Sequence, residues 1–407
     1  MINKRMFGRY SVFLDLIYTV TASLLDNFTL QFLLYPAIER QVGEARYGEI
    51  LVFLTLGNVC GLAFGGAANS ISLTSRQRYQ TTSGDFFCIL SFISLFAAMG
   101  SVVACRNYAV SWAELVCVAI IVVLFIFRSY SFVEFQLRND YFHYLIYNII
   151  ICVGELIFLP IYNLTQWWPV LFLPGTILGL FYVIWRGTIY RKVMSRSNCF
   201  RQAARETLSL SGAYLLNYGA QNADRFLLLP LSGGVAVAQY YVASLLSKTL
   251  SMITGPLNNL IIGYLSNRKT PLNRRIFGGI SLAILIILAL FFVFIWAVSP
   301  FILSLPFLYP EMIDAILWLI PLASIAQLLV IGSSILIVLD LLVAPSFMQV
   351  LLQAVYSVSY VVLAIPFTLV MQLKGFVIAS CIAAFIRYLT AVMIGWYYLG
   401  KQEGVQI

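Results

Sequence analysis

Apolar runs long enough to cross a bilayer recur along this whole 407-residue chain, and they restrict its fold more than any other feature. A membrane-spanning helix needs about 20 apolar residues, because no water is present to satisfy the backbone polar groups of irregular structure. Hydrophobic residues make up 61% of the sequence and charged residues only 10%, whereas soluble domains carry roughly 25% charged residues. The sequence therefore predicts an all-α, polytopic membrane protein.

Twelve of these runs are expected to form membrane-spanning helices. They cover residues 10–35, 47–73, 86–105, 112–135, 142–163, 168–189, 207–230, 235–262, 277–303, 311–339, 346–372 and 375–399. The division between the tenth and eleventh runs, near Asp340 and Pro345, is the least marked. Because the run after Met1–Arg9 is long enough to span, we interpret it as the first helix rather than as a cleaved signal peptide.

Lysine and arginine gather in alternate connections between these runs. The opposite side holds only Arg40, Arg46, Arg106 and Lys374. The positive-inside rule therefore predicts that both termini are cytoplasmic. It also accounts for the net charge of +9 without a nucleic-acid partner. The bases assigned to the cytoplasm are Lys4, Arg5, Arg9, Arg76, Arg78, Arg138, Arg191, Lys192, Arg196, Arg201, Arg205, Arg268, Lys269, Arg274, Arg275 and Lys401.

The longest hydrophilic stretch, residues 190–206, lies at the midpoint of the chain and carries five bases against one acid. It predicts a cytoplasmic linker, touching anionic lipid headgroups, between six-helix lobes at 1–189 and 207–407. A short internal repeat supports two lobes, since Asp26-Asn27-Phe28 in the first helix matches Asp224-Arg225-Phe226 in the seventh. Two six-span lobes would be related by a pseudo-two-fold axis along the membrane normal.

Basic residues inside the apolar runs are candidates for a functional site, because charge in hydrocarbon costs several kcal/mol. Lys248 and Arg387 fall near the middle of their helices, where they would face a polar lumen or join an internal ion pair. Arg225 adjoins Asp224, and both structural ion pairing and substrate contact remain open for it. Arg128 lies near the cytoplasmic end of the fourth run, where its long side chain is expected to reach the surface.

Acidic residues inside the runs form a second candidate group. Asp26, Glu155 and Asp224 are the deepest, and burial favours proton exchange by such carboxyls unless a neighbouring base opposes it. They could carry a coupling proton or sodium ion, or simply neutralise the buried bases. Asp15 lies nearer the cytoplasmic surface and is expected to be solvated.

Catalytic and cofactor signatures are missing from the sequence. It contains no phosphate-binding G-x-x-x-x-G-K-[ST], no G-x-S-x-G and no H-E-x-x-H. Its seven cysteines have no C-x-x-C spacing, and the single histidine, His143, stands at a helix boundary. The expectation is therefore a protein without cofactor or metal, and any transport by it would not be driven directly by ATP.

Several short motifs are similar to those of a known family. They are 222–227 (Asn-Ala-Asp-Arg-Phe-Leu), Gly233-Gly234, 239–243 (Gln-Tyr-Tyr-Val-Ala), Gly255-Pro256 and, in the first half, 45–49 (Ala-Arg-Tyr-Gly-Glu). Together they resemble the polysaccharide-biosynthesis flippases, the O-antigen and capsule repeat-unit exporters of the multidrug/oligosaccharidyl-lipid/polysaccharide (MOP) superfamily. The span number, paired halves and short loops agree over nearly the full chain.

The resemblance implies a two-lobed bundle with a cationic central cavity in a bacterial inner membrane. Such a protein would move an undecaprenyl-diphosphate-linked oligosaccharide to the external leaflet by alternating access, with ion coupling. Its implied partners are a polysaccharide polymerase and a chain-length regulator. Two alternatives remain, a membrane glycan polymerase or acyltransferase and a cation-coupled multidrug exporter. A polymerase or acyltransferase usually needs a sizeable loop or an intramembrane histidine, and this sequence shows neither. A multidrug exporter is supported by Asp15 and Asp26 in the first helix.

Overall fold

The computed structural model describes residues 2–79, 81–190, 195–266, 273–340, 344–345 and 347–405, with side chains described outside 2–13, 76–79, 252–266, 350 and 402–405. These residues form helices and no strand, as predicted. Nine segments of the described residues are long and apolar enough to cross a membrane. The chain divides into two compact units, Met1–Arg225 and Phe226–Ile407, called unit 1 and unit 2 below.

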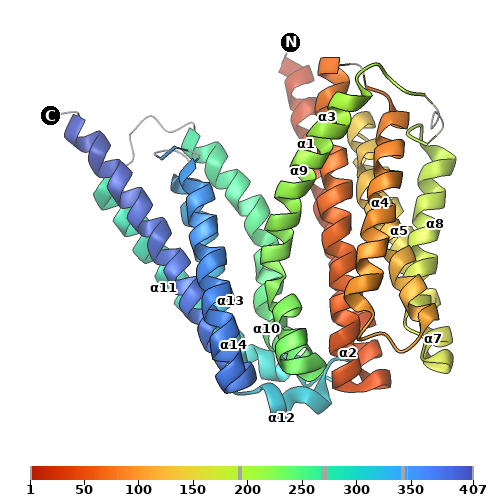
Figure 1. Cartoon of the computed structure of the whole chain (residues 1–407). Coiled ribbons are helices and arrows are strands. Elements are labelled where there is room, and N and C mark those ends of the chain that lie inside the picture. The colour runs from red at the N-terminus through yellow and green to blue at the C-terminus, as the bar shows by residue number, and fades with distance from the viewer. Residues whose placement is uncertain are drawn as a thin grey trace. The chain divides into compact units, whose positions relative to one another are not determined.

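Unit 1 is a bundle built around one central helix, α5 (Figure 1). α5 packs against α2, η2, α3, α4 and α8, and its Ile126 and Tyr130 are completely buried. The elements of this unit are α1 (Ile2–Phe28), η1 (Thr29–Leu34), α2 (Tyr35–Cys60), η2 (Gly61–Gly65), α3 (Gly66–Tyr79), α4 (Ser83–Cys105), α5 (Trp112–Arg138), α6 (Tyr141–Ile157), α7 (Leu159–Thr165), α8 (Pro169–Arg186) and α9 (Phe200–Gln221).

Unit 2 contains fewer but longer helices. They are α10 (Ala223–Ser266, which begins at the end of unit 1), α11 (Arg274–Leu303), η3 (Pro310–Met312), α12 (Ile313–Ile316), α13 (Leu319–Asp340) and α14 (Phe347–Val405). The core between α11, α13 and α14 contains the fully buried Phe277, Leu336 and Leu399. The side chains at the predicted bend, Gly255-Pro256, lie outside the described residues.

Glycine at positive φ breaks a long helix in each unit. Gly43 has a φ of 75° within α2, and Gly233 has a φ of 80° within α10. Only glycine adopts this region without strain, so each residue ends one helix and starts the next. The first two predicted spans are therefore separated by a sharp break at Gly43. Gln372, at a φ of 52°, makes the equivalent break within α14.

The predicted continuous helix 207–230 is wrong. α9 ends at Gln221, and Asn222 adopts a non-helical φ of −112° and ψ of 17° before α10 begins. Asn222 Nδ2 donates to the Tyr218 carbonyl, which satisfies one of the acceptors left at the end of the helix. Asp224 consequently stands in the first turn of a new helix, where a carboxylate is favoured by the helix dipole.

The predicted tenth helix, 311–339, is also interrupted. η3 and α12 form a short irregular lead-in, and the long helix α13 starts only at Leu319. The boundary between the two compact units falls in the chain at Arg225–Phe226 instead of at the linker 190–206, because α9 packs against α3, η2 and α4 of unit 1. α9 is thus part of unit 1.

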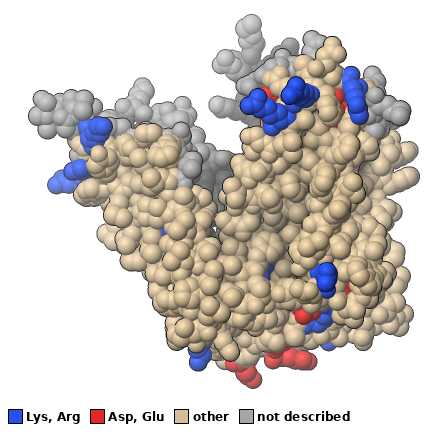
Figure 2. All heavy atoms as spheres, in the orientation of Figure 1, with Lys and Arg blue, Asp and Glu red and all other residues tan. Residues whose placement is uncertain are grey.

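The outer surface is apolar, as the lipid-facing surface of a membrane protein should be. In the view of Figure 2 the flanks of both units carry almost no charged side chains, which gather toward the helix ends. Large apolar side chains such as Phe96, Leu290 and Val370 are mostly exposed. Exposure of this kind is unfavourable in water but normal in lipid.

Candidate functional site

Three charged side chains from three helices meet inside unit 1. Arg128 of α5 places Nη2 2.5 Å from Oδ1 of Asp26 on α1, and Nη1 3.9 Å from Oε1 of Glu155 on α6. Glu155 is fully buried, and neither of its carboxyl oxygens accepts a hydrogen bond from the described residues. The Arg128 guanidinium is therefore bound by two carboxylates instead of extending to the surface. We call these residues the Arg128 cluster.

Close helix packing places Glu155 at this position. Gly154 of α6 faces Gly175 of α8 so closely that a Cβ on Gly154 would lie 2.7 Å from the Gly175 Cα. A Cβ on Gly175 would lie 2.7 Å from the Glu155 Cγ. Paired small residues allow helix backbones to approach in this way in membranes. The carboxyl group of Glu155 is consequently held against the neighbouring helix and toward Arg128.

Arg225 and Asp224 lie in the same unit as this cluster. Arg225 Nη1 donates a hydrogen bond to Thr55 Oγ1 on α2, and Asp224 is only 6% exposed. Tyr35 lies within electrostatic range of Arg225 and of all three members of the Arg128 cluster. The structure therefore brings together most of the charges that the sequence singled out in this half. Asp15 is half-buried on α1, and it forms no ion pair with another described residue.

In unit 2 the two predicted bases lie against aromatic rings. Arg387 Cζ lies 4.7 Å from the centroid of the Tyr356 ring, and Lys248 Nζ lies 5.5 Å from that of Tyr240. Cation–π contacts of this kind are worth about 0.5–2 kcal/mol each, more when desolvated. In the described part of the chain Arg387 forms no ion pair, and its Nε has no hydrogen-bond partner.

A row of rings connects these two cations. Tyr356 packs on Tyr360 at 5.9 Å between centroids, Tyr360 on Phe376 at 5.9 Å, and Phe376 on Tyr240 at 5.3 Å. The sequence analysis named both bases but not the rings, since aromatic residues are common along the chain. Only the tertiary packing of α10 against α14 identifies which ones are involved. We call this the aromatic row.

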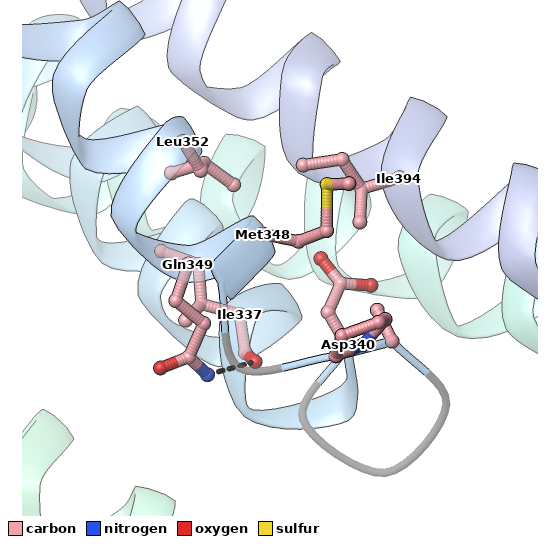
Figure 3. Close-up of a pocket in the computed structure, with 8 residues that line it drawn as sticks. Ile337, Asp340, Met348, Gln349, Leu352 and Ile394 are labelled. Carbon is pink, nitrogen blue, oxygen red and sulfur yellow. Dashed lines mark hydrogen bonds between the residues drawn. The ribbon is translucent and has the colours of Figure 1, made fainter.

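The sequence analysis missed Asp340, which it treated only as a boundary. Its side chain is 3% exposed, and neither carboxyl oxygen has a hydrogen-bond partner among the described residues. Figure 3 shows the carboxyl group pointing toward Met348 and Ile394. A Cβ on Gly395 would lie 2.5 Å from Oδ1, so the absence of a side chain there makes room for the carboxyl group. The feature of the sequence that could have identified Asp340 is its position as an acidic residue at the end of an apolar run.

The motif at residues 45–49 has a structural role. Arg46 binds Glu114 of α5, Glu49 and the Tyr108 carbonyl, and Trp168 Nε1 also donates to Glu114. These contacts connect the start of the helix after Gly43 to the α4–α5 and α7–α8 connections. Packing at one end of unit 1 thus explains residues 45–49, one of the motifs on which the family resemblance rests.

Comparison with known proteins gives a structural match without a sequence match. No protein-family model matches the sequence, and no curated protein matches it significantly. An inward-facing multidrug resistance MATE family transporter of the MOP superfamily superposes with a TM-score of 0.63 and 13% identity, over 94% of this chain and 95% of that one. An outward-facing structure of such a transporter gives 0.60 and 13%, over 95% of both.

A flippase structure matches equally well. The lipid II flippase MurJ, in an inward closed conformation, superposes with a TM-score of 0.63 and 14% identity, over 95% of this chain and 87% of that one. Nearly the whole chain is covered in each case, so the likeness extends through both units rather than through one helical hairpin. The chain is therefore a multi-pass membrane protein with the fold that these MATE transporters and MurJ share.

Proposed function

We propose that this protein is a flippase that moves an undecaprenyl-diphosphate-linked oligosaccharide from the cytoplasmic to the external leaflet. The observation that carries the proposal is Arg387, a guanidinium stacked on Tyr356 within a membrane-spanning helix and outside any ion pair of the described residues. A planar guanidinium can bind phosphate oxygens bidentately, and a diphosphate is the densest anion of such a substrate. Lys248, at the other end of the aromatic row, adds a second cation.

The proposal includes alternating access, and the division of the chain into two compact units that each carry part of the charge supports it. Binding and release would exchange access between leaflets by moving one unit against the other. The Arg128 cluster supplies a second element, because a proton or cation at Asp26 or Glu155 would alter how strongly Arg128 is held. Ion coupling is therefore part of the proposal. A polymerase and a chain-length regulator would act on the exported unit.

The first test compares parent and gene-deleted cells by surface-polysaccharide gel, with lipid-linked intermediates quantified. Loss of all repeat units outside, with the lipid-linked unit accumulating inside, is the expected result. A single repeat unit still reaching the surface would mean that polymerisation had failed instead, and the flippase proposal would be wrong. Restoring the gene with Arg387→Ala should leave the defect, whereas Lys374→Ala, an exposed cation over Trp318, should correct it.

A cation-coupled multidrug exporter is the second candidate. It is favoured by the partly buried Asp26, by the fully buried Glu155 and by the MATE transporters among the structural matches. A drug-susceptibility panel on the deleted strain separates the two functions. Increased susceptibility with normal surface glycan would establish drug export and exclude the flippase. Unchanged susceptibility with lost glycan would do the reverse.

A further inference from the structure

Helix α9 has the length of a membrane span but not the composition of one. Its 22 residues rise about 33 Å, close to the roughly 30 Å of a bilayer's hydrocarbon core. It is nevertheless absent from the nine segments of the described chain that are apolar enough to cross a membrane. A helix of this kind needs water or a polar partner along part of its surface.

The polar residues of α9 are concentrated on one ridge. Side chains four apart along a helix stand one above the other, so they form a continuous row inclined to the helix axis. One such row contains no large apolar residue, and all of its members are exposed. We call it the polar ridge, and it consists of Arg201, Arg205, Ser209, Ala213, Asn217 and Gln221.

The other faces of α9 differ from this ridge. Ala203, Thr207 and Ser211 are buried where α9 packs against α3 and η2. The neighbouring exposed row includes Leu208 and Leu216, which are 55% and 78% exposed and suited to lipid. Most of the polar exposure on α9 therefore follows one inclined row, which winds roughly halfway around the helix between Arg201 and Gln221.

The first part of the ridge lines an open groove of about 1210 Å³ within unit 1. Arg201 and Arg205 lie on its wall, followed by Ser209 and Ala213. Neither arginine forms an ion pair among the described residues, and the acid in the groove, Glu206, accepts a hydrogen bond from Gln202. The groove thus begins with two cations and continues along uncharged polar and small side chains.

The last part of the ridge offers the groups that recognise sugars. Gln221 Nε2 donates to Asn217 Oδ1 at 3.2 Å, and these amides keep further donors and acceptors. Tyr214 and Tyr218 flank them on the adjacent row with their rings 5.9 Å apart, and the Tyr214 hydroxyl lies 3.5 Å from Ser70 Oγ. Arg225 comes four residues after Gln221, in the first turn of α10 beyond the break at Asn222.

From this arrangement we infer that the polar ridge of α9 binds the saccharide part of the substrate, and this inference rests on the proposed function. Arg201 and Arg205 attract the anionic lipid at the groove. Asn217 and Gln221 then hydrogen-bond to sugar hydroxyls, while the rings of Tyr214 and Tyr218 provide faces for stacking. Small side chains at Ser209 and Ala213 leave the row unobstructed between the two groups.

Binding to two lipids tests this assignment. The full-length protein in lipid nanodiscs is titrated with lipid-linked oligosaccharide extracted from the deleted strain and with undecaprenyl diphosphate lacking sugar. Asn217→Leu combined with Gln221→Leu should weaken oligosaccharide-lipid binding about tenfold or more, since several hydrogen bonds are lost. The affinity for the sugar-free diphosphate should stay within about twofold. Leu208→Ala combined with Leu216→Ala, on the neighbouring row, should change neither affinity.

Equal weakening for both lipids, or no weakening for either, would overturn the assignment. A parent protein that binds and reorients the oligosaccharide lipid, while the ridge variant does so equally well, would refute this inference and leave the proposed function standing. A parent protein that binds neither lipid would refute both. The two failures are therefore distinguishable.

Cysteine labelling provides a second measurement if the double variant does not fold. Ser209→Cys and Asn217→Cys should react with a charged, water-soluble maleimide in membranes, above the background of the parent protein. Leu208→Cys and Leu216→Cys should react at least about tenfold more slowly, because hydrocarbon excludes the reagent. The oligosaccharide lipid, but not undecaprenyl diphosphate, should protect Asn217→Cys. Equal reactivity on both rows, or equal protection by both lipids, would contradict the inference.

Discussion

Unit 1 and unit 2 each place an arginine within a membrane-spanning helix, yet they stabilise it in different ways. Arg128 lies between Asp26 and Glu155, whereas Arg387 lies against the ring of Tyr356 and outside any ion pair of the described residues. A buried charge bound by opposite charges contributes to folding, because removing one partner leaves the others uncompensated. A cation over a ring retains most of its charge for an incoming anion. From this difference we propose a structural role for Arg128 and substrate binding for Arg387.

Arg128→Met should have the largest effect on stability. It leaves the fully buried Glu155 and the partly buried Asp26 without a cation. Removing one partner of a buried ion pair typically costs about 3–5 kcal/mol in the free energy of unfolding. Thermal unfolding in detergent measures the loss. Adding Asp26→Asn and Glu155→Gln to Arg128→Met should recover much of it, since no unpaired charge remains. An Arg128→Met protein as stable as the parent would contradict the contrast between the two units.

Gly175→Ala tests the same cluster without changing any charge. The new Cβ would approach the Ile151 carbonyl oxygen at 2.6 Å and the Glu155 Cγ at 2.7 Å, so α6 and α8 must separate. Overpacking of this kind costs about 1–3 kcal/mol. The matched change is Gly212→Ala, where nothing lies within 4 Å and replacing a helical glycine should be neutral or slightly stabilising. Equal unfolding temperatures for the two variants would show that the close approach is unimportant.

Arg387→Ala should lower stability by only about 1 kcal/mol, the contribution of one cation–π contact, while abolishing export. Unfolding and surface glycan are therefore measured for both arginine variants. The two arginines are distinguished by comparing, for each variant, its loss of export with its loss of stability. Arg387→Lys keeps the charge but not the planar fork, and we expect partial export from it. If Arg387→Ala destabilised the protein as strongly as Arg128→Met, the aromatic contact would be structural and the comparison would fail.

The smallest effect is expected at Lys374. Its Nζ lies 5.6 Å from the Trp318 ring, but the residue is exposed. Solvated cation–π contacts contribute about 0.5 kcal/mol, so Lys374→Ala should be close to the parent in both unfolding and export. A clear export defect would mean that cation–π geometry by itself, rather than depth within the bundle, determines which bases matter.

The sequence predicts the helical membrane fold well, because the apolar length of a segment is a local property. It fails where a single residue interrupts a helix. Asn222 carries no strong breaking signal within the apolar run 207–230, yet it ends α9. Gly43 shows the opposite case, in which a glycine between two expected spans adopts a positive φ.

The sequence predicts several residues of the candidate site but not how they pair. Asp26, Arg128 and Glu155 could be named as buried charges, but their pairing joins three helices and depends on the contact between Gly154 and Gly175. Asp340 was overlooked because it marks the end of a run, where carboxylates are usually solvated. The polar ridge of α9 was missed because a four-residue period becomes visible only once the helix limits are known.

The composition of α9 has a consequence for how the protein is made. A segment with Arg201, Arg205, Asn217 and Gln221 exposed partitions poorly from the translocon into lipid by itself. Its buried row, Ala203, Thr207 and Ser211, fits a surface that exists only after α3 and η2 are in place. Membrane integration of α9 should therefore depend on the preceding helices, so the first half of the chain acts as an intramolecular chaperone for the start of the second.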